Sequence, residues 1–270
     1  WALLIWFAYT LLELVNPEAL SFEAWFYAVR GVSLYFLCTV LLTLVLLHKE
    51  KDFDTFIMIW FCFSLLGTLW GMKQFFIGLD AAESRWLESG AKITHVLFGK
   101  LRIFSFYSDA GQFGAAQAHT AVTAFILALG KGNNGKRIFF LITALLSIYG
   151  MLISGTRGAL FVVITGMAIY LLLSNNLKII LPGIIAGVLV FCMLKFTMIG
   201  QGNDQIRRMR TALDPNDASL QVRLDNQKKL SAYLESRPMG GGIGSGGSWG
   251  KRFSPGTFLA ETELDSWYVK

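Results

Sequence analysis

The chain has 270 residues, of which 54% are hydrophobic and only 16% charged, and its formal net charge is +6. A composition this apolar excludes an ordinary soluble domain and predicts a protein with several membrane spans. No block of Lys and Arg of the kind that binds nucleic acid is present, so we expect membrane lipids and no nucleic acid among its partners.

The three cysteines lie in apolar runs and lack the spacing of metal ligands, so no metal site is expected. The chain opens inside an apolar run and stops directly after an acidic and aromatic stretch. We therefore expect it to be part of a longer protein.

Seven apolar runs organise the first 196 residues, and each is a candidate membrane span. They are Trp1–Val15, Ala24–Leu47, Thr55–Met72, Ala110–Leu129, Ile138–Ile153, Ala159–Ser174 and Ile179–Phe196. The strands of a barrel would alternate apolar and polar residues, which these runs do not. The predicted fold class is therefore all-α: a polytopic transmembrane helical bundle with short helices in an extracytoplasmic loop region.

The charges of the short loops predict the orientation of this bundle. Lys and Arg gather in loops 48–54, 130–137 and 175–178, which places these loops on the cytoplasmic side. The opposite side then receives the outer loop 73–109, the turn 154–158 and everything after residue 196. We accordingly expect two domains: a bundle over residues 1–196 and an extracytoplasmic region over 197–270 that leads into a further helix.

Two arginines in the first half of the chain lie close to predicted span ends. Arg30 stands about two turns inside the second span, where it either snorkels to the interface or lines a cavity. Arg102 lies in the outer loop, just before the fourth span. That span carries a stripe of polar and small residues, from Asp109 to Thr123, which either lines a cavity or joins helices.

The turn Ser-Gly-Thr-Arg-Gly at 154–158 connects two apolar runs of 16 residues. Its two glycines allow a tight reversal, and Arg157 stands at the tip. A guanidinium binds oxyanions through two parallel hydrogen bonds, so Arg157 is a candidate anion ligand. The alternative is an arginine that only anchors a helix end.

The region after residue 196 predicts one clear helix, Ser219–Glu235, whose leucines share a face with Arg223. Arg223 must therefore find an anion or snorkel from that face. Arg207, Arg208 and Arg210 are expected to be solvated charges beside the membrane.

Two further segments of this region carry a possible chemistry. The glycine-rich stretch 238–249 can form an anion-binding turn, although its composition favours a flexible loop. Glu261, Glu263 and Asp265 follow, either as a proton acceptor site or as the acidic first turn of a helix.

Taken in order, these features resemble a known family. The chain has an arginine before an aspartate at a span mouth, Thr156-Arg157-Gly158 between two spans, then Arg223 and Arg-Pro-Met-Gly-Gly-Gly-Ile-Gly at 237–244. This order is similar to that of the bacterial O-antigen ligase and O-antigen/exopolysaccharide polymerase superfamily. The resemblance covers residues from about 100 to 270.

The resemblance implies a metal-independent, cofactor-free glycosyltransferase of the bacterial inner membrane. Such enzymes move a glycan from undecaprenyl pyrophosphate to an acceptor hydroxyl on the periplasmic face, the acceptor being another glycan or lipid A core. It implies that Arg157 and Arg223 hold the pyrophosphate, with Arg102 as a third candidate. Cations at this point stabilise the charge that builds up on the leaving group.

The chain departs from the ligase pattern at the general base. Ligases carry a histidine in the outer loop, whereas this sequence has no histidine after residue 196. Asp265 or Glu263 is then the candidate base, with His95 as a weaker substitute, and a polymerase-like member is favoured. A transporter or flippase of lipid-linked glycans, and a structural envelope protein, are the competing classes.

Overall fold

The computed structural model describes residues 1–97, 99–130, 132–174, 176–212, 214, 216, 218–237 and 239–262. This part of the chain is helical apart from one short ribbon, in which β1 (Val96–Leu97) pairs antiparallel with β2 (Lys100–Leu101). The chain divides into two compact units, one formed by residues 1–53 with 215–270 and the other by residues 54–214. The division predicted at residue 196 concerns the polarity of the chain and stays a prediction.

All seven apolar runs form helices. Within the described residues, four helical stretches are long and apolar enough to cross a membrane: Phe22–Leu46, Glu50–Phe76, Asn134–Ser154 and Leu177–Phe196. The apolar helices Ala2–Val15 and Arg157–Leu173 are shorter. The last of the four stretches has no buried residue, so its leucines and valines face outward, as a lipid environment requires.

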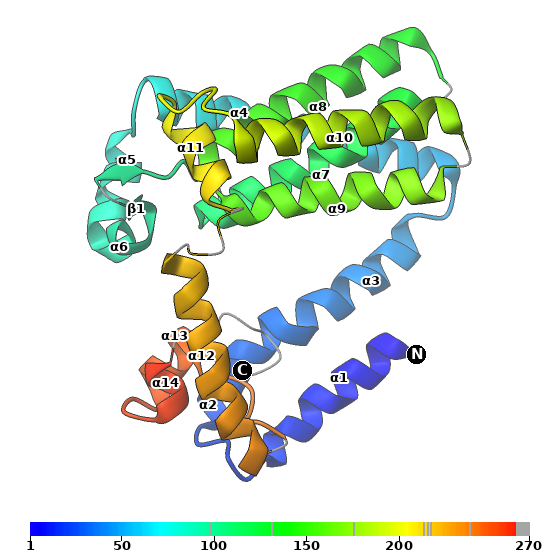
Figure 1. The fold of residues 1–270 in the computed structure, drawn as a ribbon. Coiled ribbons are helices and arrows are strands. Elements are labelled where there is room, and N and C mark those ends of the chain that lie inside the picture. The colour runs from blue at the N-terminus through cyan, green and yellow to red at the C-terminus, as the bar shows by residue number, and fades with distance from the viewer. Residues whose placement is uncertain are drawn as a thin grey trace. The chain divides into compact units, whose positions relative to one another are not determined.

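The unit 54–214 is a bundle built on helix α7 (Ala110–Leu129). It packs against α8 (Asn134–Ser154) and α9 (Arg157–Leu173), and α10 (Leu177–Phe196) lies against α9 (Figure 1). Helix α4 (Glu50–Phe76) joins them through Phe61, which is fully buried beside Ala124 and Ala144. Small residues at these contacts allow the helices to approach closely.

A single glutamine joins three of these helices. The amide oxygen of Gln117 accepts hydrogen bonds from the hydroxyls of Ser64 (2.9 Å) and Thr68 (3.0 Å), and its amide nitrogen donates to the carbonyl of Ser64 (3.2 Å). On its other side lies Gly150 of α8. Gln117 stands outside the predicted polar stripe, whose exposed member His119 lies beside the ring of Trp60. The side-chain hydrogen bonds described between α4 and α7 are therefore made by Gln117 and not by the predicted stripe.

The two ends of this bundle have different chemistry. At one end Lys136 pairs with Asp54 at 3.2 Å, next to the start of α8. At the other end the turn between α8 and α9 meets the start of α7 and helix α11 (Asp204–Thr211). The short helices α5 (Ala81–Trp86), η3 (Leu87–Ala91) and α6 (Lys92–His95) precede Arg102, whose side chain contacts this turn. Loop 48–54 and turn 154–158 thus lie at opposite ends, as the order of spans predicts.

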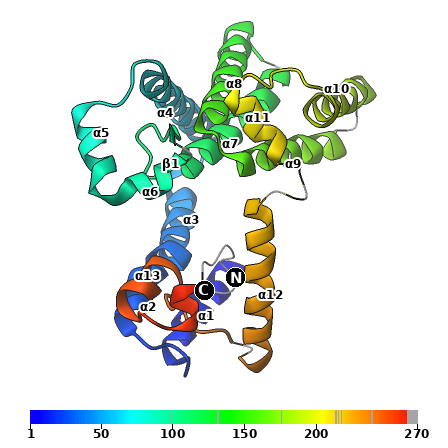
Figure 2. The ribbon, with the colours of Figure 1, turned by 60° about the vertical axis from the view of Figure 1, so that its left-hand side comes forward.

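The other unit combines the two ends of the sequence. It contains α1 (Ala2–Leu12), η1 (Glu13–Val15), α2 (Phe22–Val29), the π-helical segment η2 (Arg30–Leu34), α3 (Tyr35–Leu46), α12 (Ala218–Ser236), α13 (Gly247–Phe253) and α14 (Phe258–Glu261). Trp25 holds α2 to α1 by donating a hydrogen bond to the carbonyl of Thr10 (2.9 Å). Helix α13 lies beside α2 (Figure 2).

The glycine-rich segment 239–247 is packed onto α2, contrary to the flexible loop that its composition favours. Ile243 is buried with Trp25 and Val29. Gly244 has a φ of +90°, and a Cβ at this position would overlap the carbonyl oxygen of Ala24. Gly242 is equally close to Ala19. Glycine is therefore required here so that the backbone can lie directly on the first turn of α2.

Candidate functional site

The turn between α8 and α9 places Arg157 through two helix caps. Gly155 ends α8 in the left-handed conformation (φ 61°), and the hydroxyl of Ser154 accepts a hydrogen bond from the amide of Thr156 at 3.2 Å. Thr156 caps α9, so Arg157 is the first residue of that helix. A glycine in this position is the ordinary way to end a helix. The motif Ser-Gly-Thr-Arg-Gly at 154–158 thus forms a short turn that reverses the chain between α8 and α9.

Helix α7 packs against this turn. The hydroxyl of Thr156 donates to the carbonyl of Ala110 at 2.8 Å, at the start of α7. Gly114, one turn further along, has no room for a side chain because Ser154 and Thr156 occupy that space. The turn is therefore fixed to α7 by a hydrogen bond and by close contact.

Arg102 reaches the same turn from the outer loop. Its Nη2 atom donates to the hydroxyl oxygen of Thr156 at 3.3 Å. Its backbone amide donates to the carbonyl of His95 at 2.8 Å, and the β1–β2 ribbon lies between these two residues. The loop therefore delivers Arg102 as the sequence predicts, and a side chain contact ties it to the residue before Arg157.

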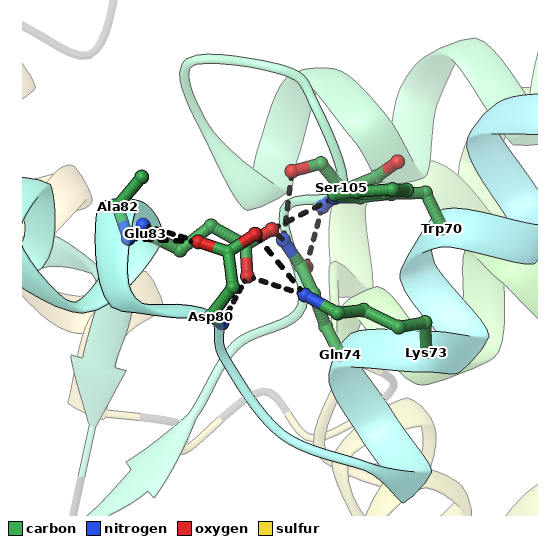
Figure 3. A network of polar contacts seen from close by, with 7 residues as sticks. All are labelled: Trp70, Lys73, Gln74, Asp80, Ala82, Glu83 and Ser105. Atoms are coloured by element: carbon green, nitrogen blue, oxygen red, sulfur yellow. Dashed lines mark hydrogen bonds and ion pairs between the residues drawn. The ribbon is translucent and has the colours of Figure 1, made fainter.

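Hydrogen bonds of Gln74 and Ser105 form a clamp that fixes the chain just after Arg102. The side chain amide of Gln74 donates to the carbonyl of Ser105 and accepts from its amide, both at 2.8 Å (Figure 3). The hydroxyl of Ser105 donates to the carbonyl of Gly67 at 2.7 Å. These bonds hold Ser105 at a φ of 57°, which a residue other than glycine adopts only when its surroundings enforce it.

Glu83 connects this clamp to α5. Its carboxylate accepts hydrogen bonds from Trp70 (2.7 Å), Lys73 (2.9 Å) and Gln74 (2.8 Å), as Figure 3 shows. Asp80 and Glu83 together form a capping box at the start of α5. Burial alone would raise the pKa of Glu83, but the hydrogen bonds from Gln74 and the others outweigh it and lower that pKa. The loop that carries Arg102 is therefore anchored at both ends.

Helix α11 brings a third arginine, Arg208, to the turn. Its Nη1 atom lies 3.1 Å from the position that a Cβ of Gly155 would occupy. The next turn of α11 contributes Thr211, whose hydroxyl oxygen accepts a hydrogen bond from Nη1 of Arg157 at 3.1 Å. The prediction that Arg208 is a solvated charge is wrong, because its side chain lies half-buried on the backbone of the turn.

The neighbours of Arg208 have other partners. Arg207 is exposed and pairs with Asp204, which also pairs with Lys100. Arg210 donates hydrogen bonds to the carbonyls of Thr197 and Ile199, at the end of α10. No periodic pattern in the sequence separates Arg208 from these two residues, which is why sequence analysis missed it.

The three arginines affect one another electrostatically. The pKa of Arg102 lies below its ordinary value, first because burial disfavours the charged form and further because Arg157 is close, although Asp109 opposes both effects. The pKa of Arg208 is lowered by burial, then by Arg102 and Arg157. An arginine stays protonated even so, and the arrangement therefore concentrates positive charge at one turn.

This concentration suits a ligand with several anionic oxygens. Among the described residues, five buried side-chain atoms have no hydrogen-bond partner, and two of them are Nε of Arg102 and Nε of Arg210. An unpaired buried donor is costly, and an anionic oxygen would satisfy it. The described residues contain no group of His, Cys, Asp and Glu that could hold a metal ion.

The remaining predicted residues lie in the other compact unit, outside the described residues, or under aromatic rings of the loop. Arg223 lies in α12 with an exposed side chain and belongs to the other compact unit, so its convergence with Arg157 stays a prediction. Glu263 and Asp265 lie outside the described residues. His95 is buried under Trp86 and Phe104, with Nδ1 2.9 Å from the carbonyl of Ala91, and cannot reach a solvent-borne substrate there.

Comparison of the chain with protein-family models, with curated proteins and with solved structures gave no match. The family resemblance seen in the sequence therefore rests on the motifs alone.

Proposed function

We propose that this chain is part of a glycosyltransferase of the bacterial inner membrane that uses an undecaprenyl-pyrophosphate-linked glycan as donor. One observation carries the proposal: Arg102, Arg157 and Arg208 converge on a single turn at one end of a helical bundle. The sequence predicts Arg102 and Arg157 as pyrophosphate ligands. Arg208 adds a third guanidinium at the same turn and supports the same chemistry.

In this proposal the seven apolar helices cross the membrane, and the arginine end of the bundle faces the periplasm. The acceptor hydroxyl attacks the anomeric carbon of the donor glycan, and the bond from that carbon to the phosphate oxygen breaks. Undecaprenyl pyrophosphate leaves with the electron pair, and the arginines stabilise its charge. Glu263 or Asp265 takes the proton of the acceptor hydroxyl.

The test is release of undecaprenyl pyrophosphate by the purified full-length protein, supplied with lipid-linked glycan from the source cell. Release with chain lengthening and without lipid A core identifies a polymerase. Release only with lipid A core identifies a ligase. No release under either condition, with intact donor confirmed, rejects the enzyme and favours the transporter alternative.

A further inference from the structure

A second site with its own chemistry lies in the unit formed by residues 1–53 and 215–270. A cavity of about 410 Å³ opens between the end of α2, the segment η2 and the start of α13. This volume falls within the range of about 300–1,000 Å³ typical of small-molecule pockets. All the residues that line it belong to this one unit.

Aromatic rings form one wall of the cavity. The ring of Tyr27 stacks on that of Trp249, with centroids 4.9 Å apart and an angle of 23° between the planes. Phe253 stacks on Tyr27 at 5.5 Å and 18° and also lies 6.2 Å from Trp249, so the three rings form a compact cluster. Three nearly parallel rings make a wall that cannot easily deform. Tyr35, on the far side of η2, also lines the cavity.

Arg30 supplies the charge of the site. Its guanidinium carbon lies 4.7 Å above the ring centre of Tyr27, and its Nε donates to the carbonyl of Tyr27 at 3.4 Å. Arg30 begins the π-helical segment η2, and such segments often occur at functional sites. The sequence favours snorkelling for Arg30, and the structure places this residue in the lining of the cavity.

Three glycines and a serine also line the cavity. Among them are Gly244, Gly246 and Ser248. Gly31 lines the cavity from η2, and the space where its Cβ would stand is empty to 4 Å. The cavity thus combines an aromatic face with several hydrogen-bonding groups at its edge.

This combination decides between three classes of ligand. An acyl chain would offer no hydrogen-bond acceptor to the remaining N–H groups of Arg30 or to the hydroxyl of Ser248. A phosphate would use Arg30 but leave the aromatic wall uncovered. A sugar ring presents a face of C–H groups that packs on an aromatic ring and an edge of hydroxyls that bonds to arginine, serine and peptide groups. The cavity matches the sugar ring on both counts.

We propose that this cavity binds one sugar ring of a glycan, packed on the aromatic wall, with its hydroxyls bonded to Arg30 and Ser248. The assignment of that sugar to the transferred or accepting glycan rests on the proposed function. The existence of the saccharide site does not, because it follows from the cavity alone.

The experiment measures equilibrium binding, which needs no turnover. The probe is the lipid-free glycan released from the source cell's donor, added to the full-length protein in lipid nanodiscs and followed by saturation-transfer NMR. Gly31→Phe fills the cavity from η2 and should weaken binding at least about tenfold. Gly187→Phe is the matched control, because Gly187 is also a helical glycine with nothing within 4 Å and does not line the cavity.

Trp249→Leu and Arg30→Gln, which change the wall and the edge, should each weaken binding by about tenfold. Retained glycan affinity in Gly31→Phe, confirmed as folded by size-exclusion chromatography, would overturn the proposal. So would displacement of the glycan by inorganic phosphate, or by vesicles of phosphatidylglycerol, with the same dependence on Arg30. Glycan binding without any release of undecaprenyl pyrophosphate would reject the proposed function and leave the saccharide site standing.

Discussion

The guanidinium of Arg208 lies directly on Gly155, with Nη1 3.1 Å from the place where a Cβ would stand. Gly155 thus has two functions. Its φ of 61° ends α8, and its missing side chain makes room for an arginine beside the one that the turn itself carries. The geometry of the arginine cluster therefore depends on a residue with no functional group.

Gly155→Ala tests this dependence. The substitution adds strain at a positive φ and displaces Arg208, so we expect a loss of stability of about 1 kcal/mol or more and weaker donor binding. Thermal unfolding in detergent and the KM for the lipid-linked donor measure the two effects. Gly158→Ala is the control, since nothing lies within 4 Å of that position and its φ is helical, and it should change neither quantity.

Arg208→Gln and Arg207→Gln form a second matched pair. Loss of a charged hydrogen bond to the donor costs roughly 1.5–3 kcal/mol, so Arg208→Gln should raise the donor KM or lower the rate by about 10- to 100-fold. Arg207 is exposed and paired with Asp204, so its variant should stay close to wild type. Equal effects of the two substitutions in a donor-release assay would mean that α11 acts only through general charge.

Arg157→Lys should abolish transfer with little loss of expression. Lysine keeps the charge but cannot form two parallel hydrogen bonds to a phosphate. Release of undecaprenyl pyrophosphate is the measurement, with the protein level in the membrane fraction as control. Normal transfer by this variant would remove Arg157 from the site.

Gln117→Leu should destabilise the bundle by roughly 1–3 kcal/mol without changing the donor KM. The substitution removes the buried acceptor of the Ser64 hydroxyl and leaves the Thr68 hydroxyl with only the carbonyl of Ser64. Gln112→Leu is the comparison, because Gln112 is exposed at the start of the same helix. Denaturation in mixed micelles reports the difference, and the prediction fails if both variants unfold alike.

The loop that carries Arg102 should loosen in acid. The pKa of Asp80 is lowered, chiefly by the hydrogen bond from the amide of Glu83, and the pKa of Glu83 is also lowered. A carboxylate whose pKa is lower in the folded than in the unfolded state stabilises the fold. The contribution is present when the pH lies above the unfolded pKa, which is 4.5 for glutamate, and it is lost as the pH falls through the folded pKa.

Hydrogen exchange of residues 77–105, followed from pH 6 to pH 3, measures this effect. Exchange corrected for its intrinsic pH dependence should rise below about pH 4.5. In Glu83→Gln the rise should be smaller, because one of the two titrating groups is absent. A flat wild-type profile would show that the network does not control the loop.

Sequence analysis located the parts of this molecule that follow from local rules. Apolar runs predicted the helices, the Gly155–Arg157 turn was found from its glycine and hydroxyl residues, and the position of Arg102 followed from its place before a span. Each of these features depends on residues close together in the chain. The described residues are mainly helical, as the sequence predicts, and four of their helical stretches are long and apolar enough to cross a membrane.

Sequence analysis failed where the structure depends on distant contacts. Arg208 resembles its neighbours until α11 folds back onto Gly155, 53 residues earlier in the numbering. The glycine-rich segment has the composition of a linker, but Gly242 lies against Ala19 and Gly244 against Ala24 of α2, where a Cβ would overlap these residues. Neither effect is visible in periodicity or in local charge.

The packing of that segment also has a consequence for how the protein is made. Arg237 pairs with Glu18 at 2.8 Å, and Asn16 donates a hydrogen bond to the carbonyl of Met239, so the first helices are completed by residues more than 200 positions later. During synthesis α1 to α3 leave the ribosome long before those residues do. Until residues 237–239 follow, these helices therefore lack the partners of Glu18 and Asn16 and remain only partly assembled.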